Sequence, residues 1–203
     1  GGSALASDLI AHEVARLREK KPVIAYFADV AASGGYYVAA PANEIIARPL
    51  NITGSIGVVM IRFVFERALE KLGLTHEVVR RGTRSDATSP YRHWTDDERA
   101  AFDREIEGMY GDFVSIVAKG RGKKPEEIEP LARGRVYAAS DAMAVGLVDR
   151  MGGFEVAIER AEALGKLTPG RLPVVLHAPR TIPDPAEPPA GLQPIVERLG
   201  VRP

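Results

Sequence analysis

The sequence contains no cysteine, no long apolar run and no excess of charge of either sign. Without cysteine, a disulfide framework, a cysteine nucleophile and a thiolate metal site are all excluded. Lysine plus arginine and aspartate plus glutamate number 27 each. The chain therefore shows neither the basic surface typical of nucleic-acid binding nor a polybasic membrane patch. No apolar stretch approaches the roughly 20 residues that a membrane-spanning helix requires.

Short apolar runs alternate with amphipathic patterns along the chain, which predicts a layered α/β fold. Thr95 and Glu98 are spaced as in a capping box and predict the start of a long helix. The stretch 80–90 is rich in Gly, Thr, Ser and Arg and predicts a loop. The expected strands lie at 22–27, 44–47, 51–60 (after an initial turn) and 75–79, and the expected helices at 5–17, 36–40, 64–72, 95–119, 125–131, 140–145 and 154–164.

The two ends of the chain differ from its middle. Gly1-Gly2-Ser3 runs at once into a helical pattern, as a loop arriving from a strand does. We therefore expect the chain to be a fragment that lacks the first strands of its fold. A glycine-serine leader of artificial origin is the alternative for these three residues alone. Beyond Gly165 prolines crowd the chain, which predicts a domain over 1–165 and a proline-rich tail over 166–203.

Ser33 follows a predicted buried strand and precedes Gly34 and Gly35 at the start of a predicted helix. A serine hydroxyl becomes a useful nucleophile when a sharp turn exposes it beside backbone amides, which then form an oxyanion hole. The alternative is that Ala-Ser-Gly-Gly is only a tight turn that requires small residues. For the motif taken alone, this alternative is the preferred interpretation.

No base for serine activation is evident near Ser33. The four histidines are His12, His76, His93 and His177. None has an obvious acidic partner, so a Ser-His-Asp triad is not indicated. No cluster of His and Glu has metal-ligand spacing, and residues 53–57 lack the Gly-Lys-Ser/Thr ending of a phosphate loop. We therefore expect neither a metal nor another cofactor. Ser55 is a polar side chain in an apolar segment, where it must be hydrogen-bonded to be tolerated.

Four motifs occur in order along residues 1–165. They are Ala32-Ser33-Gly34-Gly35-Tyr36-Tyr37, Thr53-Gly54-Ser55-Ile56-Gly57, Gly134-Arg135-Val136-Tyr137 and Ala142-Met143-Ala144-Val145-Gly146-Leu147-Val148-Asp149. In this combination, order and spacing the chain resembles the signal peptide peptidase A family, specifically the C-terminal repeat of its long two-repeat form. The resemblance implies a ClpP/crotonase-like fold and a serine peptidase with a Ser-Lys dyad. It further implies cleavage of remnant signal peptides at the outer face of the cytoplasmic membrane.

Carried over by position, the resemblance makes Ser33 the nucleophile. It assigns the oxyanion hole to the amide of Gly34 together with one from Gly1 or Gly2. Ser55 matches the residue that orients the lysine ammonium of the dyad.

The lysine itself is missing, because this chain has Ser85 at the position that carries it in short members of the family. Neighbouring arginines cannot replace it, since a guanidinium stays protonated. In long members the lysine comes from the N-terminal repeat. We therefore expect a preceding repeat, or a separate chain, to supply the base.

Two other functions remain open. A degenerate repeat could act as an assembly scaffold, which Ser85 favours and the intact Ser33 opposes. A crotonase-like acyl-CoA enzyme would use the same oxyanion geometry without a nucleophile, but Ser33 followed by Gly-Gly-Tyr-Tyr favours the peptidase. The partners expected for a peptidase are a peptide substrate, the lysine-bearing repeat and further copies of the chain in a ring or dome.

Overall fold

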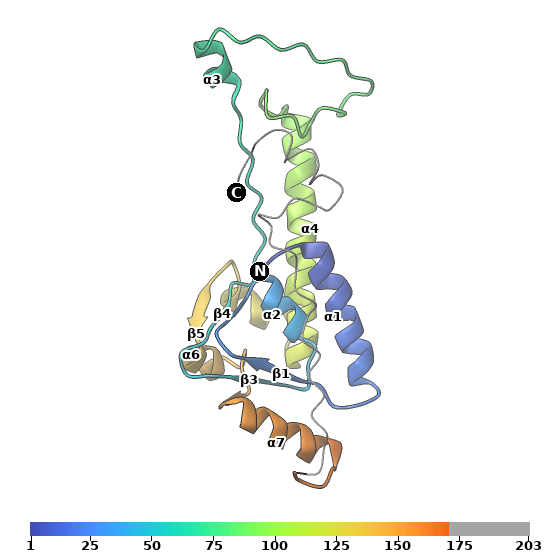
Figure 1. Cartoon of the computed structure of the whole chain (residues 1–203). Helices are drawn as coiled ribbons and strands as arrows, with labels where there is room; N and C mark the ends of the chain where they lie inside the picture. The colour runs from blue at the N-terminus through green and yellow to red at the C-terminus, as the bar shows by residue number, and fades with distance from the viewer. Residues whose placement is uncertain (171–203) are drawn as a thin grey trace, which may run out of the picture. The chain divides into compact units, whose positions relative to one another are not determined.

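Helices and short strands alternate through residues 1–170, the part of the chain that the structure, a computed structural model, describes (Figure 1). Gly1–Pro169 forms one unit. The last helix of this unit, α7 (Phe154–Gly165), ends where the sequence predicts the domain to end. The tail expected over 166–203 lies outside the described residues from position 171 onward, and the boundary between domain and tail stays a prediction.

Two three-stranded sheets form the centre of the unit. The first contains β1 (Ile24–Phe27), β3 (Glu44–Ala47) and β6 (Arg150–Met151), which are all parallel in the order β1-β3-β6. The second contains β2 (Val30–Ala32), β4 (Ile52–Gly54) and β5 (Val136–Ala138), with β2 and β4 parallel and β4 and β5 antiparallel. Parallel strands are usually covered on both faces and therefore have nearly continuous apolar sequences. For this reason β1 and β3 could be predicted from the sequence.

Helices surround these sheets at positions close to those predicted. They are α1 (Ala4–Arg18), α2 (Gly34–Ala39), α4 (Asp96–Arg121), α5 (Pro125–Ile128) with the 3-10 turn η1 (Glu129–Leu131), and α6 (Ala139–Ala144). The predicted capping box is present, because the Thr95 side chain accepts from the Glu98 amide and the Glu98 carboxylate accepts from the Thr95 amide. The helix continues two residues beyond the predicted Lys119 and ends at Gly122, whose φ of 63° is left-handed.

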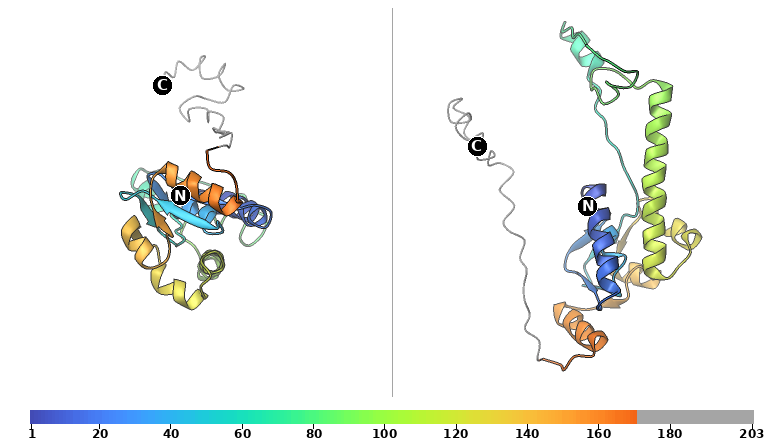
Figure 2. Two further views of the ribbon diagram at one scale, coloured as in Figure 1. Left: turned by 90° about the horizontal axis from the view of Figure 1, so that it is seen from below. Right: turned by 90° about the vertical axis from the view of Figure 1, so that its right-hand side faces the viewer.

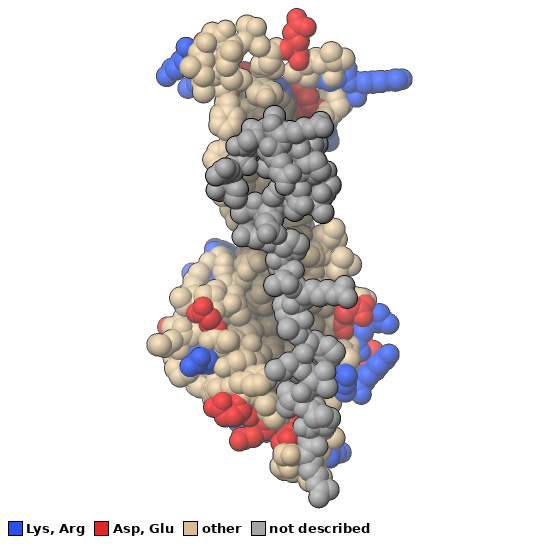
Figure 3. Space-filling view, viewed as in Figure 1, with Lys and Arg blue, Asp and Glu red and all other residues tan. Residues whose placement is uncertain are grey.

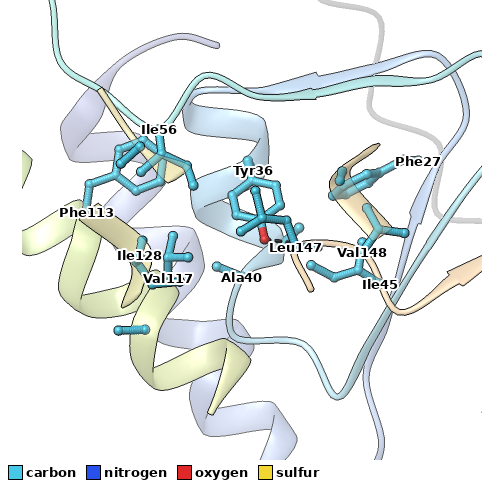
Figure 4. Packing of buried hydrophobic residues seen from close by; sticks show 14 of the residues in the cluster. Phe27, Tyr36, Ala40, Ile45, Ile56, Phe113, Val117, Ile128, Leu147 and Val148 are labelled. Carbon is cyan, nitrogen blue, oxygen red and sulfur yellow. Dashed lines mark hydrogen bonds between the residues drawn. The ribbon is translucent and has the colours of Figure 1, made fainter. Parts of the chain in front are cut away.

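The hydrophobic core lies between α2, the C-terminal half of α4, β3 and the loop after α6 (Figure 4). Its largest fully buried side chains include Tyr36, Ile45 and Leu147, and the Tyr36 hydroxyl donates to the Leu147 carbonyl at 2.8 Å. The helix α1 joins α2 through small residues, since it buries only Ser7 and Ala11. The larger apolar residues of α1 recur at roughly helical spacing but form a stripe that points outward, since Leu5, Ile10 and Leu17 are exposed.

The C-terminal end of α4 lies directly against the end of α2. A Cβ atom placed on Gly120 would stand 2.0 Å from the carbonyl oxygen of Ala40, so no larger residue fits there. The next residue, Arg121, donates to the carbonyls of Ala40 and Ala42 and pairs with Asp149. Residues that lie 80 positions apart in the sequence are thereby joined at one point.

Residues 58–95, which we call the arm, connect β4 to α4 and carry the short helix α3 (Glu66–Lys71). Figure 1 and the right-hand view of Figure 2 place α3 and the following loop at the far end of α4 from α2 and the sheets. Side chains of both charge signs project from this end (Figure 3). The strand predicted at 75–79 is wrong, because this segment has no strand partner in the described residues, and the one predicted at 51–60 is confined to Ile52–Gly54.

Candidate active site

A cavity of about 920 Å³ opens between the first turns of α1, the start of α2, the segment after β4 and the middle of α4. Gly2, Ser33, Gly34 and Ser55 all line it. Gly1 lies beside them, since a Cβ atom placed on Gly1 would be 3.8 Å from the Cβ of Ser33. The structure therefore brings together all five residues that the sequence singled out for a site.

Ser33 stands at the turn between β2 and α2 and is half-buried. Its φ of 55° and ψ of −122° lie in a region that non-glycine residues rarely adopt. Two hydrogen bonds hold this conformation, from the Ser33 amide to the Gly54 carbonyl and from the Tyr37 amide to the Ser33 carbonyl, both at 2.9 Å. Strained residues of this kind persist only where the surroundings enforce them, and they concentrate at active sites. The turn geometry is that expected of an exposed nucleophile.

Gly34 and the N-terminal glycines meet on one side of Ser33. A Cβ atom placed on Gly34 would lie 3.5 Å from the Gly2 nitrogen and 3.6 Å from the Gly1 carbonyl carbon. Gly2 and Gly34 have no side chains, so only their backbone atoms line the cavity. Two backbone amides close to a serine hydroxyl are the usual donors of an oxyanion hole.

Ser55 occupies the corresponding position on the neighbouring strand. In the parallel pair β2–β4, Ala32 lies opposite Gly54, so Ser33 and Ser55 leave the same end of two adjacent strands. Ser55 also has a positive φ, 49°, and its amide donates to the Arg135 carbonyl at 2.6 Å. The polar residue that the apolar sequence context made conspicuous is thus turned into the cavity next to Ser33.

The walls of the cavity are mainly apolar. They include Leu5 from α1, Val58 and Met60 from the arm, and Ile106, Met109 and Phe113 from α4. The ring of Tyr37 packs against Phe113 with centroids 4.7 Å apart, and its hydroxyl donates to the Asp8 carboxylate at 2.9 Å. Burial and this hydrogen bond raise the pKa of the Tyr37 hydroxyl well above its ordinary value.

A second polar cluster includes two residues that line the cavity, Tyr110 and Arg133. The Glu129 carboxylate accepts from the Tyr110 hydroxyl at 2.6 Å and from the Arg133 Nε at 3.0 Å. These two donors lower the pKa of Glu129, the tyrosine bond contributing most. Tyr110 and Arg133 line the cavity with Asp8 and Tyr37, and none of the four was selected from the sequence. The spacing of Tyr37 four residues after Ser33, one helical turn on, was the available signal for that residue.

None of the described residues that line the cavity is a lysine or a histidine. Its one arginine, Arg133, cannot serve as a base. Ser85 lies in the arm, exposed to solvent, and its hydroxyl donates to the Gly82 carbonyl at 3.1 Å. Ser85, which stands where the resemblance places the lysine of short family members, is therefore not part of this cavity.

Within residues 1–170, no group of His, Cys, Asp or Glu side chains has the arrangement of a metal site. No described helix is both long enough and apolar enough to span a membrane. His12 lies on exposed α1, His76 and His93 lie on the arm, and His177 lies outside the described residues.

Known proteins resemble this chain in sequence. Residues 15–168 match peptidase family S49. The chloroplastic serine protease SPPA of Arabidopsis thaliana is 42% identical over 163 residues, which cover 80% of this chain and 24% of that protein. The Synechocystis protein slr0021 is 36% identical over 199 residues, which cover 98% of this chain and 68% of that protein. The chain thus spans only a part of each relative.

The fold also has a relative among solved structures. A mutant ClpP1 from Listeria monocytogenes aligns with a TM-score of 0.52 at 15% identity, covering 78% of this chain and 71% of that one. This likeness confirms the expected ClpP/crotonase-like α/β fold. The sequence matches confirm the predicted resemblance to signal peptide peptidase A, and the chain belongs to peptidase family S49.

Proposed function

We propose that the chain carries the nucleophile half of a serine endopeptidase site, with Ser33 as the nucleophile. The observation that carries the proposal is the strained turn that presents Ser33 to a cavity beside the amides of Gly34 and Gly2. Membership in family S49 and the serine protease name of the Arabidopsis relative support it. The finer roles of the site residues are those that the resemblance to signal peptide peptidase A implies.

In the proposed reaction, a neutral lysine amine takes the proton of the Ser33 hydroxyl as its oxygen attacks the scissile carbonyl carbon. The negative charge moves to the carbonyl oxygen, where the amides of Gly34 and of Gly2 or Gly1 receive it. Collapse breaks the carbon–nitrogen bond, and the lysine ammonium returns the proton to the leaving amine. Water then cleaves the acyl ester by the same steps. Ser55 accepts a hydrogen bond from the ammonium and holds it toward Ser33.

The base comes from outside this chain in our proposal, from a preceding repeat of the same protein or from a separate chain. The support is the absence of lysine among the described cavity residues and the position of Ser85 on the arm. An apolar cavity suits such a lysine, because desolvation lowers the pKa of an ammonium toward neutrality. The identification of this chain as the C-terminal repeat of a two-repeat protein belongs to the same proposal.

The apolar walls suit a peptide with apolar side chains, so the proposed substrates are remnant signal peptides or other membrane-associated peptides. Because the chain belongs to family S49, we also place the enzyme at the outer face of the cytoplasmic membrane. Assembly into a ring or dome is proposed as well. Its support is the set of exposed apolar side chains on the arm, of which Phe63 is 69% exposed and Val79 fully exposed.

The test is labelling with a serine-reactive fluorophosphonate, followed by mass mapping of the modified residue. The chain alone is compared with the chain joined to the upstream repeat of its parent protein, and Ser33→Ala is the control in both samples. Modification of Ser33 only in the joined sample would establish a base supplied from outside. Modification of the chain alone would show that one of its own residues serves instead.

A catalytically degenerate scaffold is the second candidate, because the described cavity offers no base of its own. It predicts no modification of Ser33 in either sample. It also predicts that an acyl-CoA fails to bind, which separates it from a crotonase-like enzyme.

A further inference from the structure

Ser7 lies where the first turns of α1 meet the start of α2, and its side chain borders the cavity. Its hydroxyl donates to the Ser3 carbonyl at 2.9 Å, and its amide donates to the same carbonyl at 3.0 Å. Ser3 in turn caps α1, since its side chain accepts from the Ala6 amide. Ser7 is thus bonded twice to the residue that directly follows Gly2.

The opposite side of the Ser7 hydroxyl touches Gly34. A Cβ atom placed on Gly34 would stand 2.5 Å from the Ser7 Oγ, closer than two such atoms can approach. The same point is 3.5 Å from the Gly2 nitrogen. The hydroxyl therefore fills the space that the missing side chain of Gly34 leaves, and Gly2 borders the same space.

Gly1 and Gly2 precede α1, so no intrahelical hydrogen bond fixes their amides, and Gly2 has a φ of 150° that glycine adopts freely. The nearest fixed point on their side is the Ser3 carbonyl, the acceptor at the start of α1 to which both Ser7 donors bond. Gly34, by contrast, is fixed by the first turn of α2. Two donors on separate elements stabilise a developing oxyanion only if their spacing is held, because catalysis of this kind depends on preorganised dipoles.

We infer that Ser7 is a positioning residue that sets the spacing between the amides of Gly2 and Gly34. This inference rests on the proposed function. Ser7 does not touch the substrate in this role; it acts by holding Ser3 on one side and Gly34 on the other.

A matched pair of variants separates the hydroxyl from its volume. Ser7→Thr keeps a hydroxyl and adds a methyl group, whereas Ser7→Val has the same shape as threonine without the hydroxyl. Both are made in the joined protein described under the proposed function. The readouts are kcat, KM and the affinity for a peptide boronate, whose adduct on serine carries the tetrahedral oxyanion. The matched peptide amide, which binds without reacting, is the reference ligand.

Ser7→Val is expected to lower kcat and boronate affinity about tenfold or more, because small misplacements of a donor cost at least that much. KM and the affinity for the peptide amide should stay within about twofold, since they report ground-state binding. Ser7→Thr should keep most of the wild-type kcat and boronate affinity. If Ser7→Val does not fold, as judged by circular dichroism, Ser7→Ala replaces it and should change the same readouts in the same direction.

Equal boronate affinities for the threonine and valine variants would overturn the inference, as would a parallel loss of boronate and amide binding. The proposed function has a separate point of failure. If the wild-type joined protein forms no adduct at Ser33, that function fails and the role of Ser7 fails with it. If the wild type forms the adduct and the variants do not differ, only the role of Ser7 fails.

Discussion

Different interactions stabilise the region around Ser33 and the arm. Around Ser33, backbone hydrogen bonds, small residues and a buried apolar core fix the chain. In the arm, Ala87 is the one buried residue between positions 58 and 95. The arm is instead fastened by polar contacts at its end, where the Arg92 guanidinium bonds to both Asp86 and Glu98 at 2.6 to 2.9 Å.

The single tryptophan of the chain belongs to this polar cluster. The Arg62 guanidinium lies over the Trp94 ring, 4.8 Å from its centroid, and Trp94 stacks on Phe102. A region with few buried apolar contacts opens at lower free energy than the core of the same protein. The arm should therefore respond to conditions that leave the site unchanged, whereas substitutions at the site should change rates without opening the arm.

The largest expected effect is at Ser33, the proposed nucleophile. Ser33→Ala should reduce peptidase turnover of the joined protein at least about 10⁴-fold, because removal of a nucleophile abolishes the covalent route. The control is Ser115→Ala, which removes an exposed hydroxyl from α4 and should leave the rate unchanged. Turnover of Ser33→Ala at the wild-type rate would refute the assignment.

The next effect compares two consecutive glycines. A Cβ atom on Gly34 would strike the Ser7 hydroxyl at 2.5 Å, whereas a Cβ atom on Gly35 would meet nothing within 4 Å. Gly34→Ala should therefore lower kcat on the order of 10²-fold, as loss of an oxyanion donor does. Gly35→Ala should leave kcat almost unchanged. Steady-state kinetics of the two variants decide the matter, and equal rates would remove the oxyanion role from Gly34.

A smaller, local effect is expected in the arm. Arg92→Met removes the guanidinium and leaves the Glu98 carboxylate, which is 2% exposed, without its partner. Trp94 fluorescence should then report opening at a lower urea concentration, while circular dichroism of the main unit keeps its midpoint. Arg16→Met is the control, since it breaks only the exposed pair with Glu13. Loss of both transitions together would show that the two regions are one cooperative unit.

The smallest effect is a dependence on pH. Hydrogen bonds from Arg92 and then from the Thr95 backbone lower the pKa of Glu98 to about 2. Because this value lies below the unfolded pKa of about 4.3, the contribution is complete above the unfolded value and is lost as pH falls toward 2.

Trp94 fluorescence should change over that acid range while the catalytic rate near neutral pH is unaffected. Glu98→Gln should flatten the change. An unaltered acid transition in that variant would assign the effect to other carboxylates, such as Asp86, whose pKa Arg92 also lowers.

The features that the sequence could predict are those that depend on neighbouring residues. Strand β1, the turn at Ser33 and helix α2 follow from local signals, namely an apolar run, small residues and Pro41 beyond the helix. Strand β2 (Val30–Ala32), directly before Ser33, is not among the expected strands. The capping box of α4 is equally local. The fold class could be inferred from the alternation of apolar runs and amphipathic patterns. The family could be inferred from the resemblance carried by four motifs in order along the chain.

What could not be predicted depends on partners that are distant in sequence. Residues 75–79 have the pattern of a strand, but a strand also needs an edge to pair with. The outward stripe of α1 could not be foreseen, because close packing on α2 admits only Ser7 and Ala11. Asp8 and Arg133 enter the cavity from segments 125 residues apart, and no spacing rule connects them.

The contact between Gly120 and Ala40 fixes the C-terminal end of α4 against the end of α2. Its 26 residues give a rod of roughly 39 Å at 1.5 Å per residue. One end is seated against the element that carries Ser33, and the arm is attached to the other. A tilt of about 5° at the seated end moves the far end of a rod of that length by about 3 Å. The position of the arm thus depends on how α4 packs against α2, and Gly120 allows that close packing because it has no side chain.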